Sequence, residues 1–119
     1  MIISIDDTSG IPIYLQIRNQ VVEGISNGQL KPGESMPSVR ALAEETGINS
    51  MTVNKTYQLL KQEGYLVIDR RKGARIADKF QREGHLSQEN TAELRRIISE
   101  AKISGMTREQ FIEECKRYF

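Results

Sequence analysis

The densest positive charge of the chain lies at residues 69–75, DRRKGAR, where four cations accompany one acid. The net charge of the whole chain is only +1, but the local field of such a cluster attracts polyanions such as DNA. Arg70, Arg71 and Lys72 stand directly before Gly73, which permits a tight turn and a close approach to a phosphate backbone. Since a run of charges can also be a plain solvated loop, the surrounding elements have to decide between the two interpretations.

A second group of residues that could read DNA precedes this cluster, in the stretch NSMTVNK at residues 49–55. Asparagine can bond both polar groups of the adenine edge, and lysine can reach guanine O6 and N7. Serine and threonine bind phosphate or base, and methionine can contact a thymine methyl group. If this stretch opens a helix, its N-terminal residues would enter a major groove; the alternative is an ordinary solvated helix face. The candidate contacts are Asn49, Ser50, Met51, Thr52, Asn54 and Lys55.

No pattern in the sequence indicates catalysis or a metal site. His85 and Cys115 are the single residues of their types and lie far apart, without the spacing of metal ligands or of a catalytic pair. The sequence has no glycine-rich phosphate-binding motif, so we expect no enzyme, no cofactor and no metal. The single cysteine fits a reducing compartment, and no apolar run approaches the ~20 residues of a membrane span. We therefore expect a soluble, cytoplasmic protein without a membrane partner.

Two helices are expected before the candidate DNA contacts. Pro12 is favoured at a helix start, and the NG pair at residues 27–28 ends the first helix. Ser38 is a good N-cap for a second helix over residues 39–46, which Gly47 ends in the left-handed conformation. The β-prone stretch MIISI at the start of the chain favours a short edge strand. The residues expected to face the core are Tyr14, Ile17, Val21 and Ile25, then Val39, Leu42 and Ala43.

A third helix and a hairpin carry the candidate contacts themselves. The helix is capped by Asn49 or Ser50 and runs to Glu63, and two short strands follow at residues 65–77, joined by the RRKG turn. Two short helices with a tight turn, at about residues 39–58, are typical of a helix-turn-helix, and the hairpin after it makes a winged helix. We therefore expect an α+β, mostly helical fold. The core side of the third helix is Val53, Tyr57 and Leu60.

Residues 78–119 differ in kind from the expected winged-helix domain of residues 1–77. Residues 78–86 read as a linker or a frayed helix start, an amphipathic helix follows, and Thr107 opens a last helix with a capping box. Two helices of this length have too little surface for a core of their own. Because most soluble oligomers are two-fold homodimers, we expect this segment to pair with a second copy of the chain. The expected interface residues are Leu94, Ile97, Ile98, Ala101, Phe111, Ile112, Cys115 and Tyr118, with Phe119 as the alternative to Tyr118.

The motifs PIYLQI, LKPGESMPSVRALAEETGI, TVNKTYQLLKQEGYL and RRKGARI occur in this order before residue 77. They resemble the GntR family of bacterial transcription regulators, and the short C-terminal pair of helices is similar to its small YtrA-type subfamily. The resemblance implies a sequence-specific DNA-binding regulator that acts as a homodimer on an inverted-repeat operator. Arg40 in PSVR matches the arginine with which the family reaches DNA, and Ser38 lies beside it at a helix start that favours an anion. The alternative for Arg40 is an exposed arginine paired with a neighbouring acid.

The resemblance also bears on regulation. Larger subfamilies carry a C-terminal metabolite-binding domain, and the short segment after the wing leaves no room for one, so the effector stays open. Repression is favoured over activation because nothing resembles a polymerase-contacting region, and small relatives often lie beside transporter genes. Many family members carry arginine on the outer face of the third helix, and this chain has none there, which leaves guanine preference open. The alternative function is a winged helix that binds another protein; its recognition face would be apolar, against Asn54, Lys55, Gln58 and Gln62.

Overall fold

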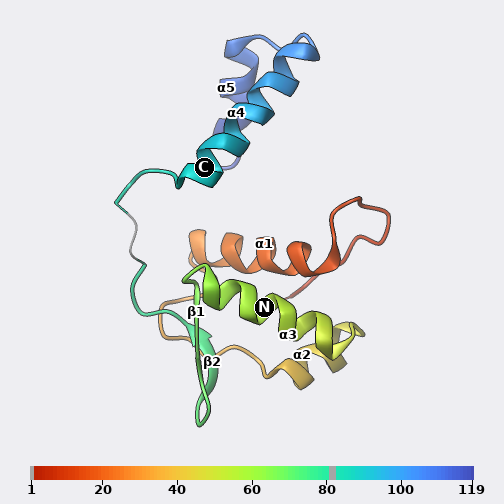
Figure 1. The fold of residues 1–119 in the computed structure, drawn as a ribbon, viewed down its shortest axis with the longest axis vertical. Helices are drawn as coiled ribbons and strands as arrows, with labels where there is room; N and C mark the ends of the chain where they lie inside the picture. The colour runs from red at the N-terminus through yellow and green to blue at the C-terminus, as the bar shows by residue number, and fades with distance from the viewer. Residues whose placement is uncertain (1, 81–82) are drawn as a thin grey trace. The chain divides into compact units, whose positions relative to one another are not determined.

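The computed structural model describes residues 2–80 and 83–119. Residues 1 and 81–82 lie outside the described residues, and so do the parts of the expected N-terminal strand and linker that fall on them. The chain divides into two compact units, Met1–Gln81 and Arg82–Phe119. Figure 1 shows the helices and strands of both units along the chain. None of the helices in the described ranges is long and apolar enough to cross a membrane.

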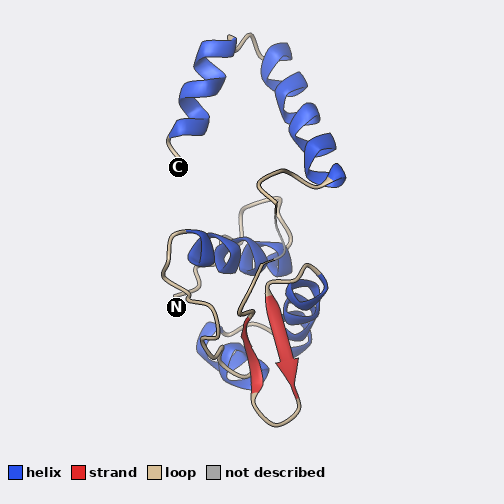
Figure 2. Ribbon diagram, turned by 90° about the vertical axis from the view of Figure 1, so that its left-hand side faces the viewer, coloured by secondary structure: helices blue, strands red, loops and turns tan. Residues whose placement is uncertain are grey.

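The first unit is a winged helix-turn-helix, as the sequence predicts (Figure 2). Its two strands pair antiparallel, with Leu66 opposite Ile76 and Asp69 opposite Gly73, so that the RRK tip forms the turn. The expected class, α+β and mostly helical, is confirmed. The elements of this unit are α1 (Ile13–Ser26), α2 (Val39–Thr46), α3 (Ser50–Gln62), β1 (Leu66–Asp69) and β2 (Gly73–Ile76).

Local caps set the ends of α2 and the start of α3. The Oγ of Ser38 accepts a hydrogen bond from the Ala41 N–H at 3.0 Å, and this bond opens α2. Gly47 ends α2 with a φ of 73°, a left-handed conformation that glycine adopts without steric cost. Asn49, rather than Ser50, caps α3, because its Oδ1 accepts from the Met51 N–H at 2.7 Å. These short-range bonds make the tight turn between the two helices.

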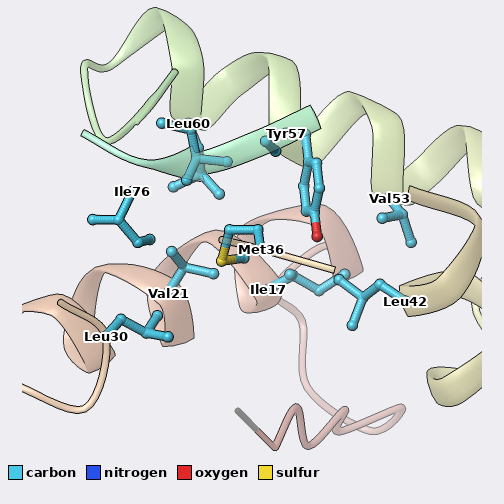
Figure 3. Packing of buried hydrophobic residues seen from close by; sticks show 11 residues of the cluster. Ile17, Val21, Leu30, Met36, Leu42, Val53, Tyr57, Leu60 and Ile76 are labelled. Carbon is cyan, nitrogen blue, oxygen red and sulfur yellow. The ribbon is translucent and has the colours of Figure 1, made fainter. Parts of the chain in front are cut away.

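The core of the first unit lies between α1, α2, α3 and the hairpin, and Figure 3 shows its side chains packed against one another. The apolar stripes of the helices supply most of it, as expected, although four of the expected core residues are only half-buried at its edge: Tyr14, Ile25, Val39 and Ala43. Thr56 is fully buried as well, and its Oγ1 lies 3.0 Å from the Thr52 carbonyl and 3.3 Å from the Tyr14 carbonyl of α1. Burial of each large apolar side chain contributes ~1.5–3 kcal/mol. The fully buried large side chains are Ile17, Val21, Leu42, Val53, Tyr57, Leu60 and Ile76.

The connection between α1 and α2 runs along the free edge of β2. The Met36 N–H donates to the Ala74 carbonyl at 2.8 Å, and the Ile76 N–H donates to the Glu34 carbonyl at 2.8 Å. The Gly33 N–H completes this ladder on the Ile76 carbonyl at 2.9 Å. Since β1 pairs with the other edge, β2 has hydrogen-bonded neighbours on both sides. The wing is thereby attached to the segment that leads into α2.

The expected edge strand at residues 1–5 is wrong for the residues that the structure describes, because residues 2–5 belong to no strand. Glutamine side chains of α1 bond this backbone instead. Gln20 donates to the Ser4 carbonyl at 2.6 Å and accepts from the Ser4 N–H at 2.9 Å. Gln16 bonds both backbone groups of Asp6 in the same way, at 3.1 and 2.9 Å. Each amide offers a donor and an acceptor, so two glutamines take the place of a partner strand.

The second unit consists of α4 (Gln88–Ile103) and α5 (Arg108–Lys116). Ser87 caps α4 by accepting from the Asn90 N–H at 3.1 Å. Thr107 opens α5 with the expected capping box. No residue of the described segment 83–119 is buried, so this unit has no core of its own within one chain.

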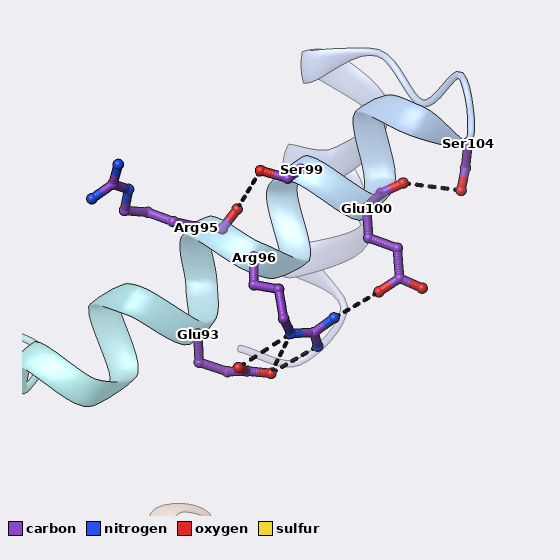
Figure 4. Close-up of polar contacts among 6 residues, drawn as sticks. All are labelled: Glu93, Arg95, Arg96, Ser99, Glu100 and Ser104. Atoms are coloured by element: carbon purple, nitrogen blue, oxygen red, sulfur yellow. Dashed lines mark hydrogen bonds and ion pairs between the residues drawn. The ribbon is translucent and has the colours of Figure 1, made fainter.

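Polar contacts support α4 along its exposed side (Figure 4). Arg96 bonds Glu93 at 2.7 Å and Glu100 at 3.1 Å, at spacings of three and four residues. Exposed pairs of this kind contribute only a few tenths of a kcal/mol each, about 0.2–0.5. They favour the helix without replacing apolar burial.

Candidate nucleic-acid interface

The N-terminal half of α3 presents a mainly polar face to solvent. Ser50, Asn54 and Lys55 are exposed, and the one large apolar side chain among them, Met51, is 78% exposed. Hydroxyl, amide and ammonium groups supply the donors and acceptors that base edges require. A protein-binding face would have an apolar centre, so this surface fits a nucleic acid better than a second protein.

Two of the expected DNA-contacting residues, Asn49 and Thr52, also make hydrogen bonds within the fold. The Oδ1 of Asn49 accepts the N-cap bond of α3, which leaves its amide nitrogen and the second lone pair of the oxygen for another partner. Thr52 is half-buried, and its carbonyl accepts from the buried Thr56. Both residues therefore help to hold the start of α3 in shape.

Lys55 is held by an aromatic ring. Its Nζ lies 4.0 Å from the centroid of the Tyr14 ring, which comes from the start of α1. A cation within ~6 Å of a ring centroid is attracted by the negative face of the ring. Sequence reasoning placed Tyr14 in the core and missed this contact, because nothing local relates residues so far apart in the chain.

The start of α2 places Ser38 and Arg40 at the surface. The Oγ of Ser38 serves the cap, and the Nε of Arg40 lies 3.3 Å from Glu44 Oε1. The two side chains of this pair are 89% and 70% exposed, so the pair is weak. Arg40 thus pairs with a neighbouring acid, as the alternative interpretation expects. The terminal nitrogens of its guanidinium take no part in that ion pair.

The wing tip carries its cations in the open. Arg70, Arg71 and Lys72 are all exposed, and Gly73 closes the turn with a φ of 72°. The Oδ1 of Asp69 accepts a hydrogen bond from the Arg71 N–H at 2.8 Å, and this bond is the main reason that the pKa of the Asp69 carboxyl lies below its ordinary value. An Asp directly before a turn is a known local signal, so this organising role could have been read from the sequence.

Hydrogen bonds join α2, α3 and the wing into one framework. The hydroxyl of Tyr57 on α3 donates to the Pro37 carbonyl at 2.7 Å, next to the cap of α2. The ladder at residues 33–36 ties the same connection to β2. Burial raises the pKa of Tyr57 to about 12, so the phenol keeps its proton at ordinary pH. No local sequence signal could have revealed the bond between Tyr57 and Pro37.

A separate apolar surface lies in the second unit, where α4 and α5 line a groove of about 660 Å³. Two of the expected interface residues, Ile97 and Tyr118, are 39% and 78% exposed and lie outside this lining. Phe119, the alternative to Tyr118, belongs to it, and so does Met106, which was not among the expected residues. In the described ranges no cluster of histidine, cysteine or acidic side chains could hold a metal ion. The expected interface residues that line the groove are Leu94, Ile98, Ala101, Phe111, Ile112 and Cys115.

Comparison with known proteins agrees with this geometry. The model of the gntR family of bacterial regulatory proteins matches residues 13–76, from the start of α1 to the end of β2. The HTH-type transcriptional repressor YtrA of Bacillus subtilis (strain 168) is 35% identical over 117 residues, which cover 96% of this chain and 89% of that protein.

Solved structures extend the likeness to the whole chain. A structure from Listeria monocytogenes EGD-e, described as a transcriptional antiterminator, has a TM-score of 0.89 at 29% identity and covers 99% of this chain and 90% of its own. YtrA from Sulfolobus acidocaldarius, described as a GntR-family transcription factor, has a TM-score of 0.61 at 38% identity, with 97% and 94% covered. The winged helix-turn-helix, the family match and these relatives together show that the chain belongs to the GntR family, in its small YtrA-like group, and is a DNA-binding transcription regulator rather than an enzyme.

Proposed function

We propose that this regulator is a repressor that acts in the cytoplasm as a homodimer on an inverted-repeat operator. The observation that carries the proposal is the combination of an exposed polar face on α3 and a wing tip with three exposed cations, both attached to one hydrogen-bonded framework. Repression is supported by the likeness to a protein named as a repressor, along nearly the full length of both chains. We further propose that the operator controls a transporter operon, as the resemblance implies.

In the proposed complex the N-terminal end of α3 enters the major groove. Asn54 reads a base edge, because its amide is exposed and has a donor and an acceptor to offer. Ser50 and Met51 lie beside it on the same face. Arg71 and Lys72 contact phosphates at the wing, and Arg40 contacts a phosphate at the start of α2, leaving its weak pair with Glu44.

The dimer is proposed to form through the second unit. No residue of its helices is fully buried in one chain, and Leu94, Ile98 and Ile112 stay 37–43% exposed on the groove lining. A second copy of the chain offers the same apolar surface, and a two-fold interface requires a surface that is complementary to itself. Lys102 and Arg108 also line the groove and could meet acidic residues of the partner at its rim.

DNA binding is tested by fluorescence anisotropy on the DNA upstream of the protein's own gene, at two salt concentrations. We expect specific binding that weakens as the salt concentration rises, because cations on the protein displace counterions from phosphates. A duplex of the same composition in scrambled order is the control. Equal affinity for both duplexes would count against an operator-specific repressor.

The dimer is tested by light scattering at tens of micromolar protein. Ile98→Asp places a charge in the groove and should produce monomers with weaker operator binding, while the winged helix keeps its thermal transition. The matched control is Ile103→Asp on the same helix, since Ile103 is already 87% exposed and does not line the groove. A monomeric wild-type protein, or equal effects of the two substitutions, would contradict the proposed interface.

A further inference from the structure

The contact between Lys55 and Tyr14 joins α3 and α1, two helices that pack against each other in the core. Lys55 belongs to the exposed face of α3, and Tyr14 belongs to the start of α1. Its ammonium lies 4.0 Å from the centroid of the Tyr14 ring. No ion pair among the described residues includes Lys55. The side chain is thus restrained by a neutral ring and not by a carboxylate.

The backbone under this contact is itself fixed. Thr56, the neighbour of Lys55, is fully buried, and its Oγ1 lies 3.3 Å from the carbonyl of Tyr14. Ile17 and Val53 pack in the core close to the same junction of α1 and α3. The ring therefore stands at a set position beside α3, and it holds the lysine at the edge of α3 that faces α1.

The chemistry of the partner decides what Lys55 can still do. A carboxylate partner reduces the positive field of a cation and occupies part of its donors, as Glu44 does for the Nε of Arg40. An aromatic ring attracts the cation with ~0.5–1 kcal/mol at an exposed site but carries no charge. Lys55 keeps its full positive field, and the N–H groups of its ammonium that point away from the ring stay free to donate.

We propose that Tyr14 is a positioning residue of the DNA interface, whose ring holds the Lys55 ammonium at the α1 edge of α3, ready to meet a phosphate beside the groove. Lys55 then positions the helix on the DNA backbone and does not read a base. This inference rests on the proposed interface on α3 and adds to it a residue of α1. The energetic benefit is preorganisation, because a lysine that is already restrained loses less side-chain freedom when it binds.

The test is a double-mutant cycle on operator affinity with Tyr14→Leu, Lys55→Met and the combined variant. Tyr14→Phe is the matched control, because phenylalanine keeps the ring. We expect Tyr14→Leu to weaken binding by about 2- to 10-fold for each protomer that engages DNA, the effect of one immobilised side chain. Tyr14→Phe should bind like the wild type. In the Lys55→Met background, Tyr14→Leu should have no further effect, whereas a purely structural role of Tyr14 would give additive losses.

The same variants separate the inference from the proposal on which it rests. Lys55→Met should weaken the operator and the scrambled duplex by the same factor, because a phosphate contact carries no sequence information. If both Lys55→Met and Asn54→Ala leave binding unchanged, the proposed α3 interface is wrong, and this inference with it. If Lys55→Met weakens binding and Tyr14→Leu does not, only the role of Tyr14 is refuted.

A measurement on the wild-type protein needs no variant to fold. The ε-methylene protons of Lys55 should show an upfield ring-current shift in the free protein, and the shift should persist in the operator complex. Loss of the shift on DNA binding would overturn the proposal, because the ring would then not position the bound lysine.

Discussion

Removal of the wing cations should change the salt dependence of DNA binding without changing the stability of the fold. The double substitution Arg71→Ala with Lys72→Ala deletes two exposed side chains. The turn itself is held by the Asp69 carboxylate and the backbone N–H of residue 71, and alanine retains that N–H. Surface substitutions of this kind change the free energy of unfolding by less than ~0.5 kcal/mol, so the thermal midpoint should scarcely move.

The expected size follows from the number of phosphate contacts. Three or four contacts per protomer, through Arg40, Arg71, Lys72 and either Lys55 or Arg70, give roughly six to eight in a dimer and a log–log salt slope of about −5 to −7. The double substitution removes up to two contacts from each protomer. At ~0.9 of a unit per phosphate, the slope should become shallower by about three to four units.

Anisotropy titrations on the operator, from roughly 50 to 200 mM salt, measure this slope directly. Arg95→Ala is the control, because it removes an exposed cation from α4, outside the proposed interface. It should leave the slope within about one unit of the wild-type value. A wild-type slope near zero, or a slope that the double substitution leaves unchanged, would refute the wing as a phosphate clamp.

Three further outcomes are expected. Asn54→Ala should relax the base preference at one position of each half-site and cost ~1–3 kcal/mol of binding free energy on the best site. Lys72→Ala should instead weaken the binding of all duplexes by a similar factor. If both substitutions weaken all duplexes equally, Asn54 does not read a base. Burial raises the pKa of Tyr57 from 10.0 to about 12. The contribution of the protonated Tyr57 to the free energy of unfolding is therefore complete below pH 10 and is lost as the pH rises through 12, by about 2–3 kcal/mol. Urea titrations across this pH range should show the loss for the wild type and not for Tyr57→Phe. Leu60→Ala should lower the free energy of unfolding by ~2–5 kcal/mol. A loss below ~1 kcal/mol would show that neighbouring side chains move in and fill the cavity that the substitution leaves.

The ends of the helices were predictable because each cap acts within its own turn. Ser38 and Gly47 bound α2 where the sequence predicted, since a hydroxyl cap and a left-handed glycine need no distant partner. Residues 2–5 were not predictable in this way. Their apolar, β-prone side chains do pack against the core through Ile3 and Ile5, but the groups that bond their backbone come from the side chains of α1.

In the candidate interface, too, features set by residues close in the chain were predictable, and contacts between distant residues were not. Exposure of Asn54 and of the wing cations followed from the helical period and from the hairpin pattern. The partners of Lys55 and Tyr57 did not follow, because the ring of Tyr14 and the carbonyl of Pro37 come from distant parts of the chain. Contacts between residues close in the chain were within reach of sequence reasoning, such as the pair between Arg40 and Glu44 on one helix and the bond from the Arg71 N–H to Asp69 in the wing turn.

The ladder between residues 33–36 and β2 has a consequence for hydrogen–deuterium exchange. The N–H groups of Gly33, Met36 and Ile76 all end on backbone carbonyls across this edge, and Met36 and Ile76 are buried. Such amides exchange only when the local structure opens. A loop without an assigned strand should therefore retain its protons about as long as the hairpin does. If the wing contacts DNA as proposed, these hydrogen bonds connect the DNA-bound hairpin to the segment that leads into α2.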